Sequence, residues 1–419
     1  MHTMTDKAMK NWSGNVQYNP ALILRPATIS ELQNVISHAT KARAYGSGHS
    51  FNTLADTDGT LIAFTEFEKQ IEIDSAKMLV RVPAGVRYGD IAPELHQNGF
   101  ALKNMGSLPH ITVVGATSTG THGSGVGNKN LAGSITGIEM ITATGDAVVL
   151  REEELPVARI ALGSLGIIHH VTLELVPTYE VAQTVYFDMP FEQFVSNLYE
   201  ILSAGYSVSA FSMWGDDFVD QVWVKSKIGT NPVLTQKDWY GASLATEKSH
   251  PIREAENTAA TEQLGVPGPW FERLPHFKLD FTPSFGEELQ TEYFVDRKDA
   301  AAALRAIYMI RKELSDLILV CEIRTVEKDF NWLSEAYDRD AFVIHFTLRP
   351  NISAVEKLLL ILHESLKPFK ARPHWGKLFT NTAFDFSGLY PKFNDFLKYR
   401  ETYDPSRKFV NSILETWGL

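Results

Sequence analysis

Residues 43–52 read RAYGSGHSFN, and the fold of the first part of the chain is best inferred from this stretch. A short strand signal at 43–45 leads into a turn in which two glycines bracket a serine, and His49 follows directly. Gly-rich turns commonly hold phosphates, because their backbone N–H groups approach a ligand without side chains in the way. An imidazole at the end of such a turn needs a chemical reason.

Two further Gly-rich segments follow, GATSTGTHGSGVGN (115–128) and LGSLGII (162–168). Neither these nor GSGHSFN fits G-x-G-x-x-G, since Phe51 and Asn130 stand where a third glycine belongs, and no G-K-[ST] occurs. The standard nucleotide-binding folds are therefore disfavoured. Three such turns can still converge on one pyrophosphate, and the alternative is that each is only a tight turn.

The bulk composition narrows the class of protein. The chain has 419 residues, 44% hydrophobic and 21% charged, which favours two or three domains over one core. A net charge of −11 without clustered basic residues argues against nucleic acid and anionic membranes as partners. A single cysteine excludes an intramolecular disulfide. No segment is apolar enough to span a bilayer, and the N-terminus lacks a signal-peptide pattern, so we expect a cytoplasmic protein. The acidic composition is compatible with a monomer, which we also expect.

Residues 1–177 alternate short strand and helix signals. Thr28 and Glu31 form a T-x-x-E capping box before a helical stripe, and Gly99 ends a second helix. A hairpin is expected to turn at 144–146, and a short helix at 158–166.

After Pro177 the helical stripes lengthen, at 191–204, 299–314 and 354–366, with strands between them at 317–326 and 342–348. This pattern favours an antiparallel sheet with helices on one face. Residues 236–268 are polar and read as a surface excursion, and 403–414 read as a segment that docks back onto the first domain.

Metal and hydrolase chemistry find little support. No H-E-x-x-H or G-x-S-x-G occurs, and the adjacent His169 and His170 would point to opposite faces of a strand. His110 and His122 flank a Gly-rich helix start, but no carboxylate is spaced to join them. We therefore expect no metal site.

The second half holds a set of polar residues in apolar settings. Glu322 and Arg324 in CEIRTV share one strand face, His345 lies in VIHFT, and Lys377 lies in RPHWGKLFT. Each has an ordinary alternative: an exposed salt bridge, a satisfied core histidine, or a lysine whose stem packs on apolar surface.

Together these motifs resemble a known family. The stretches GSGHSF, ALKNMGSLPHITVVGATSTGTHGSGVGN, GVPGPWFERLPHF, CEIRTV, HFT, RPHWGK and DPSRKFVN resemble the alditol oxidases, within the vanillyl-alcohol-oxidase superfamily of FAD enzymes. The resemblance runs from about Asn11 to the C-terminus. It implies a two-domain α+β fold with an FAD-binding domain at 1–177, a substrate domain at 178–385, and a segment at 386–419 that returns to the FAD domain.

The resemblance also gives a role to the histidine. In the family it is bonded covalently to the 8α-methyl carbon of the flavin, which His49 would imitate. The first helix after residue 112 would lie along the pyrophosphate, with backbone N–H groups at its start. The implied cofactor-binding residues are Gly46, Ser47, Gly48, His49, Ser50, Ser107, Thr112, Gly115, Ala116, Thr117, Ser118, His122 and Ile168.

The implied reaction moves hydride from the terminal carbinol carbon of a polyol, such as xylitol or sorbitol, to the flavin. Reoxidation by dioxygen yields hydrogen peroxide beside the aldose. Arg324 would place a cation near the flavin, Lys377 would be hydrogen-bond partner or base, and Gly106 would leave space for dioxygen. The implied catalytic residues are Arg324, Lys377, Glu322 and His345, and Ser107 and Thr347 join them in binding substrate.

Two alternatives stay open. One is a sugar-1,4-lactone oxidase or dehydrogenase on the same fold, and the other is an FAD-binding carrier without turnover. Comparing turnover of a polyol with turnover of an aldonolactone distinguishes an alditol oxidase from the lactone enzyme. Bleaching of the flavin by a polyol excludes the carrier.

Overall fold

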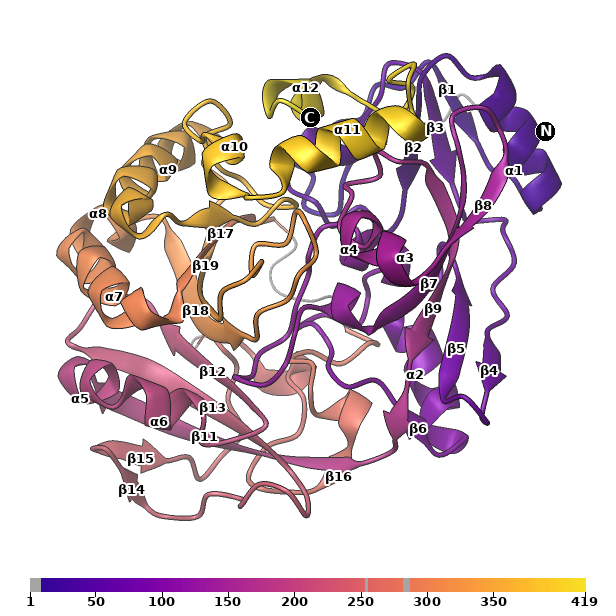
Figure 1. The fold of residues 1–419 in the computed structure, drawn as a ribbon. Helices are drawn as coiled ribbons and strands as arrows, with labels where there is room; N and C mark the ends of the chain where they lie inside the picture. The colour runs from indigo at the N-terminus through magenta and orange to yellow at the C-terminus, as the bar shows by residue number, and fades with distance from the viewer. Residues whose placement is uncertain (1–8, 253–254, 282–286) are drawn as a thin grey trace.

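The computed structural model describes residues 9–252, 255–281 and 287–419 (Figure 1). Most of the N-terminal stretch considered for a signal peptide, residues 1–8, lies outside the described part. Strands of the N-terminal region form three small sheets. They are a parallel sheet of β1 (Leu22–Leu24), β3 (Thr60–Ala63) and β2 (Ala42–Tyr45), an antiparallel sheet of β4 (Glu72–Asp74), β5 (Leu79–Pro83), β9 (Ile167–Glu174), β7 (Ile135–Ile141) and β8 (Ala147–Leu150), and the pair β10 (Val176–Pro177) and β6 (Phe100–Ala101).

Local sequence signals set most of the N-terminal helix ends. In α1 (Ile29–His38), Thr28 accepts a hydrogen bond from the Glu31 N–H at 3.2 Å, and the Glu31 carboxylate accepts one from Ala27 N–H at 2.8 Å. The capping residue is confirmed, although the return bond reaches one residue further back than in a standard capping box. Gly99, at φ 82°, follows α2 (Tyr88–Gln97).

The helix expected at 158–166 is wrong. The structure has α4 (Leu155–Ala158) instead, with a proline in its first turn, and it ends where the expected helix begins. Beyond it, Leu162 (φ 54°) and Gly163 (φ 67°) are left-handed, which no α-helix accommodates. The hairpin of β7 and β8 forms as predicted.

The second region is built on one large antiparallel sheet. Its strands lie in the order β14-β15-β11-β13-β12-β18-β19-β17-β20, with β16 beside β11. The bounds are β11 (Glu180–Pro190), β12 (Ser207–Ser212), β13 (Phe218–Lys227), β14 (Asp238–Trp239), β15 (Ala242–Leu244), β16 (Gly268–Pro269), β17 (Leu289–Asp296), β18 (Ile318–Val326), β19 (Ala341–Leu348) and β20 (Arg372–Pro373).

Helices cover one face of this sheet, as Figure 1 shows on its left side. They are α5 (Phe191–Ser196), α6 (Leu198–Leu202), α7 (Ala300–Met309), α8 (Arg311–Ser315) and α9 (Ile352–Leu366). Alternate strand residues, such as Tyr293, Ile323 and Ile344, pack with these helices into one apolar core. The predicted α+β architecture, with helices on one face of an antiparallel sheet, is confirmed.

The other face of β17, β18 and β19 carries the polar residues. In the register, Glu292 pairs with His345, and His345 pairs with Glu322, so these three form one row across the strands. Since side chains alternate along a strand, residues two positions away extend the same face. The sheet therefore has an apolar face toward the helices and a polar face toward the N-terminal region.

The C-terminal segment contacts helix α1 and loops of the N-terminal region. It contains α10 (Phe386–Leu389), α11 (Phe393–Tyr403) and α12 (Ser412–Thr416). The Lys408 ammonium donates to the carbonyls of Ile36 and Ala143, both at 2.6 Å, and Asn411 donates to Asp56 O at 2.8 Å. These contacts tie residues near the end of the chain to residues near its beginning.

Residues 236–268 are only in part the surface excursion expected from their polarity, since residues 236–238, 246–247 and 256–258 are exposed but several others are buried. Thr261 and Gln263 are fully buried, and the Gln263 amide exchanges hydrogen bonds with the Ser249 backbone at 2.8 and 2.7 Å. Polar side chains that satisfy backbone groups internally can be buried, which composition alone does not reveal.

His169 and His170 do not point to opposite faces as expected. Glu139 pairs with His170 and Met140 pairs with Ile168, so His169 is an extra residue in β9, a β-bulge. The Nδ1 atoms of the two histidines lie 2.7 Å apart.

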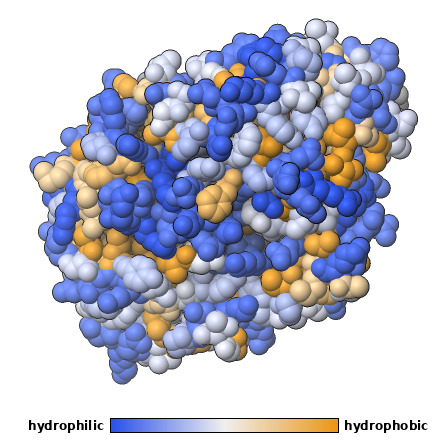
Figure 2. Space-filling view, in the orientation of Figure 1, coloured by the Kyte–Doolittle hydropathy of each residue, from blue (hydrophilic) through white to orange (hydrophobic). Residues whose placement is uncertain are grey.

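Within residues 9–252, 255–281 and 287–419, no helix is both long and apolar enough to cross a lipid bilayer. Figure 2 shows polar residues over most of the visible face, with apolar residues in scattered groups.

Candidate active site

A cavity lies between the Gly-rich turns of the N-terminal region and the polar face of the large sheet. Its N-terminal wall comes from the three Gly-rich segments around 46–51, 106–121 and 162–168. The opposite wall comes from β17 and the residue before it, β18, β19, the segment after β20 and the segment around His276. Its polar residues are Glu288, Gln290, Glu292, Glu322, Arg324, His276, His345, Thr347, His374 and Lys377. The three Gly-rich turns, which the sequence suggested could converge, thus line the same cavity.

His49 faces this cavity from the first turn. Its Nδ1 lies 3.1 Å from Ser47 Oγ, and its ring stacks on Trp12 at 5.3 Å between centroids. Within the described part of the chain, the buried Nε2 atom has no hydrogen-bond partner. Burial, with Lys377 and His110 nearby, lowers the pKa of His49 to about 4, so the ring is neutral and nucleophilic at neutral pH.

The glycines around His49 are needed for close approach of the backbone. Gly48 has φ 71°, and a Cβ at Gly46 would collide with Thr112 Oγ1. Ser47 Oγ accepts the Thr112 N–H at 3.1 Å, which fastens the turn to the start of the next helix. Ser50 also lines the cavity.

That next helix, α3 (Val113–Thr117), offers fewer N–H groups than expected. The N–H groups of Ala116 and Ser118 donate to Thr112 O and Val114 O at 3.0 and 3.1 Å, inside the helix. The Thr117 side chain is buried outside the cavity lining, and its hydroxyl donates to Val113 O at 3.0 Å. Among the residues that the structure describes, the first-turn amides of Val114 and Gly115 are left for a ligand, because the Val113 N–H donates to Val86 O at 2.9 Å and later amides bond within the helix.

The remaining N-terminal candidates line the cavity or its inner end. Gly115, Ala116, Ser118 and Ile168 are in its lining. His122 also lines it, but its Nε2 lies 2.9 Å from Glu292 Oε1 and its Nδ1 lies 2.7 Å from Gly123 O. Glu292, 170 residues from His122, thus supplies the carboxylate that was not found near it in the sequence. His110 lies apart from this pair, and its Nε2 contacts Leu279 O.

Glu292 is the centre of the polar face. It accepts a hydrogen bond from Arg324 Nη2 at 2.6 Å and one from His345 Nδ1 at 3.2 Å. Burial acts to raise its pKa, but Arg324, His122 and His345 outweigh burial and hold the pKa well below its ordinary value. Glu292 is therefore ionised, although only 2% of it is exposed.

Glu322 has its own buried support. His276 Nε2 donates to Glu322 Oε1 at 2.7 Å, and the Lys225 ammonium donates to His276 Nδ1 at 3.0 Å. Burial acts to raise the Glu322 pKa, but Arg324 and His276 lower it, so this carboxylate is also charged. Burial lowers the pKa of Lys225 to about 7.

Arg324 is fixed on one side and open on the other. Its Nη2 bonds Glu292, and its Nη1 contacts Ser107 Oγ at 3.4 Å. Its Nε atom lies 3.5 Å from Glu322 Oε1, and among the residues that the structure describes this buried N–H has no hydrogen-bond acceptor. A carboxylate and an unused guanidinium donor thus stand side by side at the cavity wall.

Lys377 reaches the cavity from the segment after β20. Its ammonium donates to Gln290 Oε1 and lies 4.8 Å from the centre of the Phe51 ring. Burial and Arg324 lower its pKa to about 8, against the opposing charge of Glu292. Asn52 donates to the carbonyls of Trp375 and Lys377 at 2.8 and 2.9 Å, so the histidine turn and the lysine segment are joined directly.

His345 and Thr347 complete the face. His345 donates through Nδ1 to Glu292, and its Nε2 lies 3.2 Å from Thr347 Oγ1, which leaves Nε2 to accept. Next to them, Glu288 is buried, and its Oε2 atom has no partner within the described residues.

Sequence reasoning missed several of these residues: Glu288, Gln290, Glu292, His276, His374 and Lys225. A signal existed for three of them. Glu288, Gln290 and Glu292 alternate with Leu289, Thr291 and Tyr293, and this period of two marks one polar strand face. His276 lies in the quoted stretch GVPGPWFERLPHF, but no local pattern gave it a role, and none marked Lys225: the Glu322 partner of His276 is 46 residues away, and Lys225 and His276 are 51 residues apart.

Residues 20–151 match the family described as FAD binding domain, and residues 281–417 match D-arabinono-1,4-lactone oxidase. An alditol oxidase of a Streptomyces species is 41% identical over 97% of this chain and 98% of its own. An L-gulono-1,4-lactone dehydrogenase of Mycobacterium tuberculosis is 29% identical over 96% of each chain.

Solved structures share the fold at much lower identity. A solvent-stable cholesterol oxidase superposes with a TM-score of 0.79 at 14% identity, covering 98% of this chain and 97% of its own. At that identity the likeness shows the fold alone.

Proposed function

Since the chain belongs to the alditol oxidase family of FAD-dependent oxidoreductases, we propose that it oxidises the terminal carbinol of a polyol such as xylitol or sorbitol. The products would be the aldose and, with dioxygen as the electron acceptor, hydrogen peroxide. The Streptomyces relative is named for alditol oxidation, and it is more similar to this chain than the lactone dehydrogenase.

The N-terminal wall fits a flavin nucleotide. The cavity meets three Gly-rich turns, a Cβ at Gly46 would obstruct the approach to Thr112, and His49 presents a buried ring nitrogen that no described residue uses. We propose that FAD is bound here and is bonded covalently to a ring nitrogen of His49. Ser47, Thr112, Gly115, Ala116, Ser118 and Ile168 would hold it, together with Gly46, Gly48, Ser50 and Ser107.

One observation carries the choice of substrate. Arg324 Nε is a buried donor without an acceptor, Glu322 Oε1 lies 3.5 Å from it, and Glu288 Oε2 is a buried acceptor without a donor among the described residues. A hydroxyl both donates and accepts, so it satisfies an unpaired donor and a neighbouring carboxylate at once. A chain of hydroxyls therefore suits this face, because a buried polar group left unpaired is costly.

The chain's own residues would act as follows. Bound FAD supplies a hydride acceptor that dioxygen can reoxidise. Lys377, with its pKa lowered to about 8, takes the proton from the reacting hydroxyl. Glu322 and Ser107 hold further hydroxyls, and Arg324 provides a fixed cation where negative charge develops. His345 and Thr347 bound the far side of the substrate.

A sugar-1,4-lactone oxidase or dehydrogenase is the second candidate, because residues 281–417 match a lactone oxidase family. A lactone offers fewer hydroxyl donors, since its ring and carbonyl oxygens only accept hydrogen bonds. Glu288 and Glu322, both acceptors, are better matched to a polyol. Oxygen uptake and peroxide release with xylitol, sorbitol and L-gulono-1,4-lactone test the choice. A higher kcat/KM for the lactone would reverse it.

We further propose the division into an FAD domain at 1–177, a substrate domain at 178–385 and a returning segment at 386–419. The contacts of Lys408 and Asn411 support it. The single, buried cysteine and the acidic composition support a cytoplasmic monomer, which size-exclusion chromatography with light scattering tests.

A further inference from the structure

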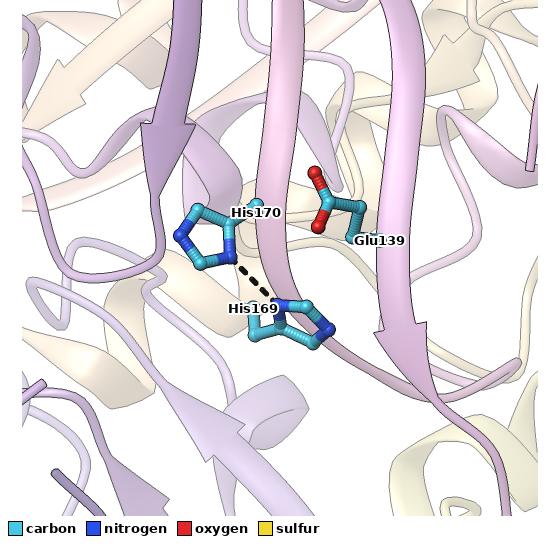
Figure 3. A group of neighbouring side chains, drawn as sticks. All are labelled: Glu139, His169 and His170. Atoms are coloured by element: carbon cyan, nitrogen blue, oxygen red, sulfur yellow. Dashed lines mark hydrogen bonds between the residues drawn. The ribbon is translucent and has the colours of Figure 1, made fainter. Parts of the chain in front are cut away.

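Three side chains of the five-stranded sheet, well outside the proposed catalytic set, converge on one point. Figure 3 shows Glu139 of β7 turned toward His169 and His170 of β9. The two Nδ1 atoms lie 2.7 Å apart, and one ligand atom from each of the three residues lies within 4.8 Å of the others. Two imidazoles and a carboxylate form a common donor set for zinc.

The β-bulge creates this convergence. Consecutive residues of a regular strand point to opposite faces, whereas the extra residue His169 brings both rings to the same place. A β-bulge commonly redirects a side chain, and this bulge redirects the ring of His169 toward that of His170. Both rings are buried.

The electrostatic surroundings suit a divalent cation. Burial lowers the pKa of both histidines to about 4, so near pH 7 each ring is neutral, with one protonated nitrogen and one lone-pair nitrogen. Arg81 holds Glu139 through two hydrogen bonds of 2.6 and 2.9 Å and also pairs with Glu72. Glu68 Oε1 lies 2.8 Å from His170 Nε2, although it is not aligned as a hydrogen bond. Three carboxylates against one guanidinium leave the cluster with two net negative charges.

We propose that Glu139, His169 and His170 bind a divalent cation of the zinc class. The ligands are the two Nδ1 atoms and a Glu139 oxygen, and water completes the coordination. Each neutral ring then carries its proton on Nε2, so the ring that donates in the present Nδ1–Nδ1 contact shifts its proton to Nε2 and no proton is released. The Nε2–H of His170 would face Glu68, the type of outer partner that metal-bound histidines usually have.

Imidazole ligands select zinc, nickel or copper over magnesium and calcium. The bound ion would link β7 to β9 one residue from Ile168, which lines the cavity. We therefore assign it a stabilising role at that wall. The proposal does not depend on the substrate or on the flavin tether.

The test uses the purified flavoprotein after chelation and dialysis. Isothermal titration with Zn²⁺ and thermal unfolding are compared for the wild type, His169→Gln, His170→Gln and Glu139→Gln, with the exposed His38→Gln as control. We expect one Zn²⁺ per chain and a higher melting temperature in the wild type and His38→Gln. Both effects should be lost in the two histidine variants and weakened in Glu139→Gln. Mg²⁺ should have no effect.

Absence of Zn²⁺ binding to the wild type would overturn the proposal, as would binding that survives in both histidine variants. If those variants fail to fold, a zinc-soaked wild-type crystal decides by anomalous scattering. A peak between the three side chains supports the site, and a peak only elsewhere refutes it.

Discussion

Glu292 Oε1 lies 2.6 Å from Arg324 Nη2, and this buried ion pair spans from β17 to β18 across the intervening strand β19. The pair fixes the guanidinium by one edge, so that its Nε stays directed toward Glu322 at 3.5 Å. Glu292 also receives His345 at 3.2 Å. One carboxylate thus orients two residues of the proposed substrate face.

Glu292→Gln should disrupt this arrangement without removing a substrate ligand. Breaking one side of a buried ion pair typically costs about 3–5 kcal/mol of folding stability. We expect a lower melting temperature and a loss on the order of a hundredfold in the rate of anaerobic flavin reduction, equivalent to about 3 kcal/mol. Stopped-flow absorbance measures it, with the exposed Glu356→Gln as control. Equal rates in the two variants would refute the positioning role of Glu292.

Lys377 should give flavin reduction a characteristic pH dependence. Its folded pKa of about 8 lies below the ordinary lysine value, so the neutral amine, the form that accepts a proton, accumulates as pH rises through 8. Below that pH the rate should rise about tenfold per unit, and above it the rate should level. Lys377→Met should lower the rate by roughly 10²–10⁴-fold and remove the transition. The exposed Lys357→Met is the control, and an unchanged profile in Lys377→Met would exclude the base.

Gly106→Ala should separate the two half-reactions. A Cβ at Gly106 would lie 3.6 Å from His122 O and from Ile111 Cδ1, ordinary contact distances, so the variant should fold. The added methyl group would narrow the space proposed for dioxygen, so reoxidation should slow while anaerobic reduction stays close to that of the wild type. Gly127→Ala, where no described atom lies within 4 Å of the added Cβ, controls for the backbone change. Equal slowing of both half-reactions argues against an oxygen path at Gly106.

His49→Ala should release the flavin. After acid precipitation, the wild-type pellet should remain yellow, and intact mass should exceed the polypeptide mass by one FAD. In His49→Ala the colour should appear in the supernatant, while the exposed variant His38→Gln should behave as the wild type. Colour in the wild-type supernatant would exclude the tether and leave a non-covalent flavoprotein.

Local signals predicted much of the fold. The cap at Thr28, the glycine after α2 and the hairpin of β7 and β8 depend on residues within a few positions of one another, so they can be read in a single pass. The same holds for the apolar alternation that places helices on one face of the large sheet. The bulge at His169 and the left-handed Leu162 depend on strand register and tertiary packing, which spacing does not encode.

The site was predictable only in part for the same reason. Glu322, Arg324 and Lys377 could be singled out because each stands in an apolar or aromatic setting. The ionisation and orientation of these groups depend on Glu292 and His276, which are 32 and 46 residues away from their partners. Likewise Thr117 looks equivalent to its neighbours in GATS, and only the direction of its side chain takes it out of the cavity lining.

The most direct test of the central claim is the visible spectrum of the purified protein under anaerobic conditions after addition of xylitol. We predict rapid bleaching of the flavin, with colour restored when oxygen is admitted, and much slower bleaching with L-gulono-1,4-lactone. A flavin that is bleached by the lactone and left oxidised by xylitol and sorbitol would contradict the account.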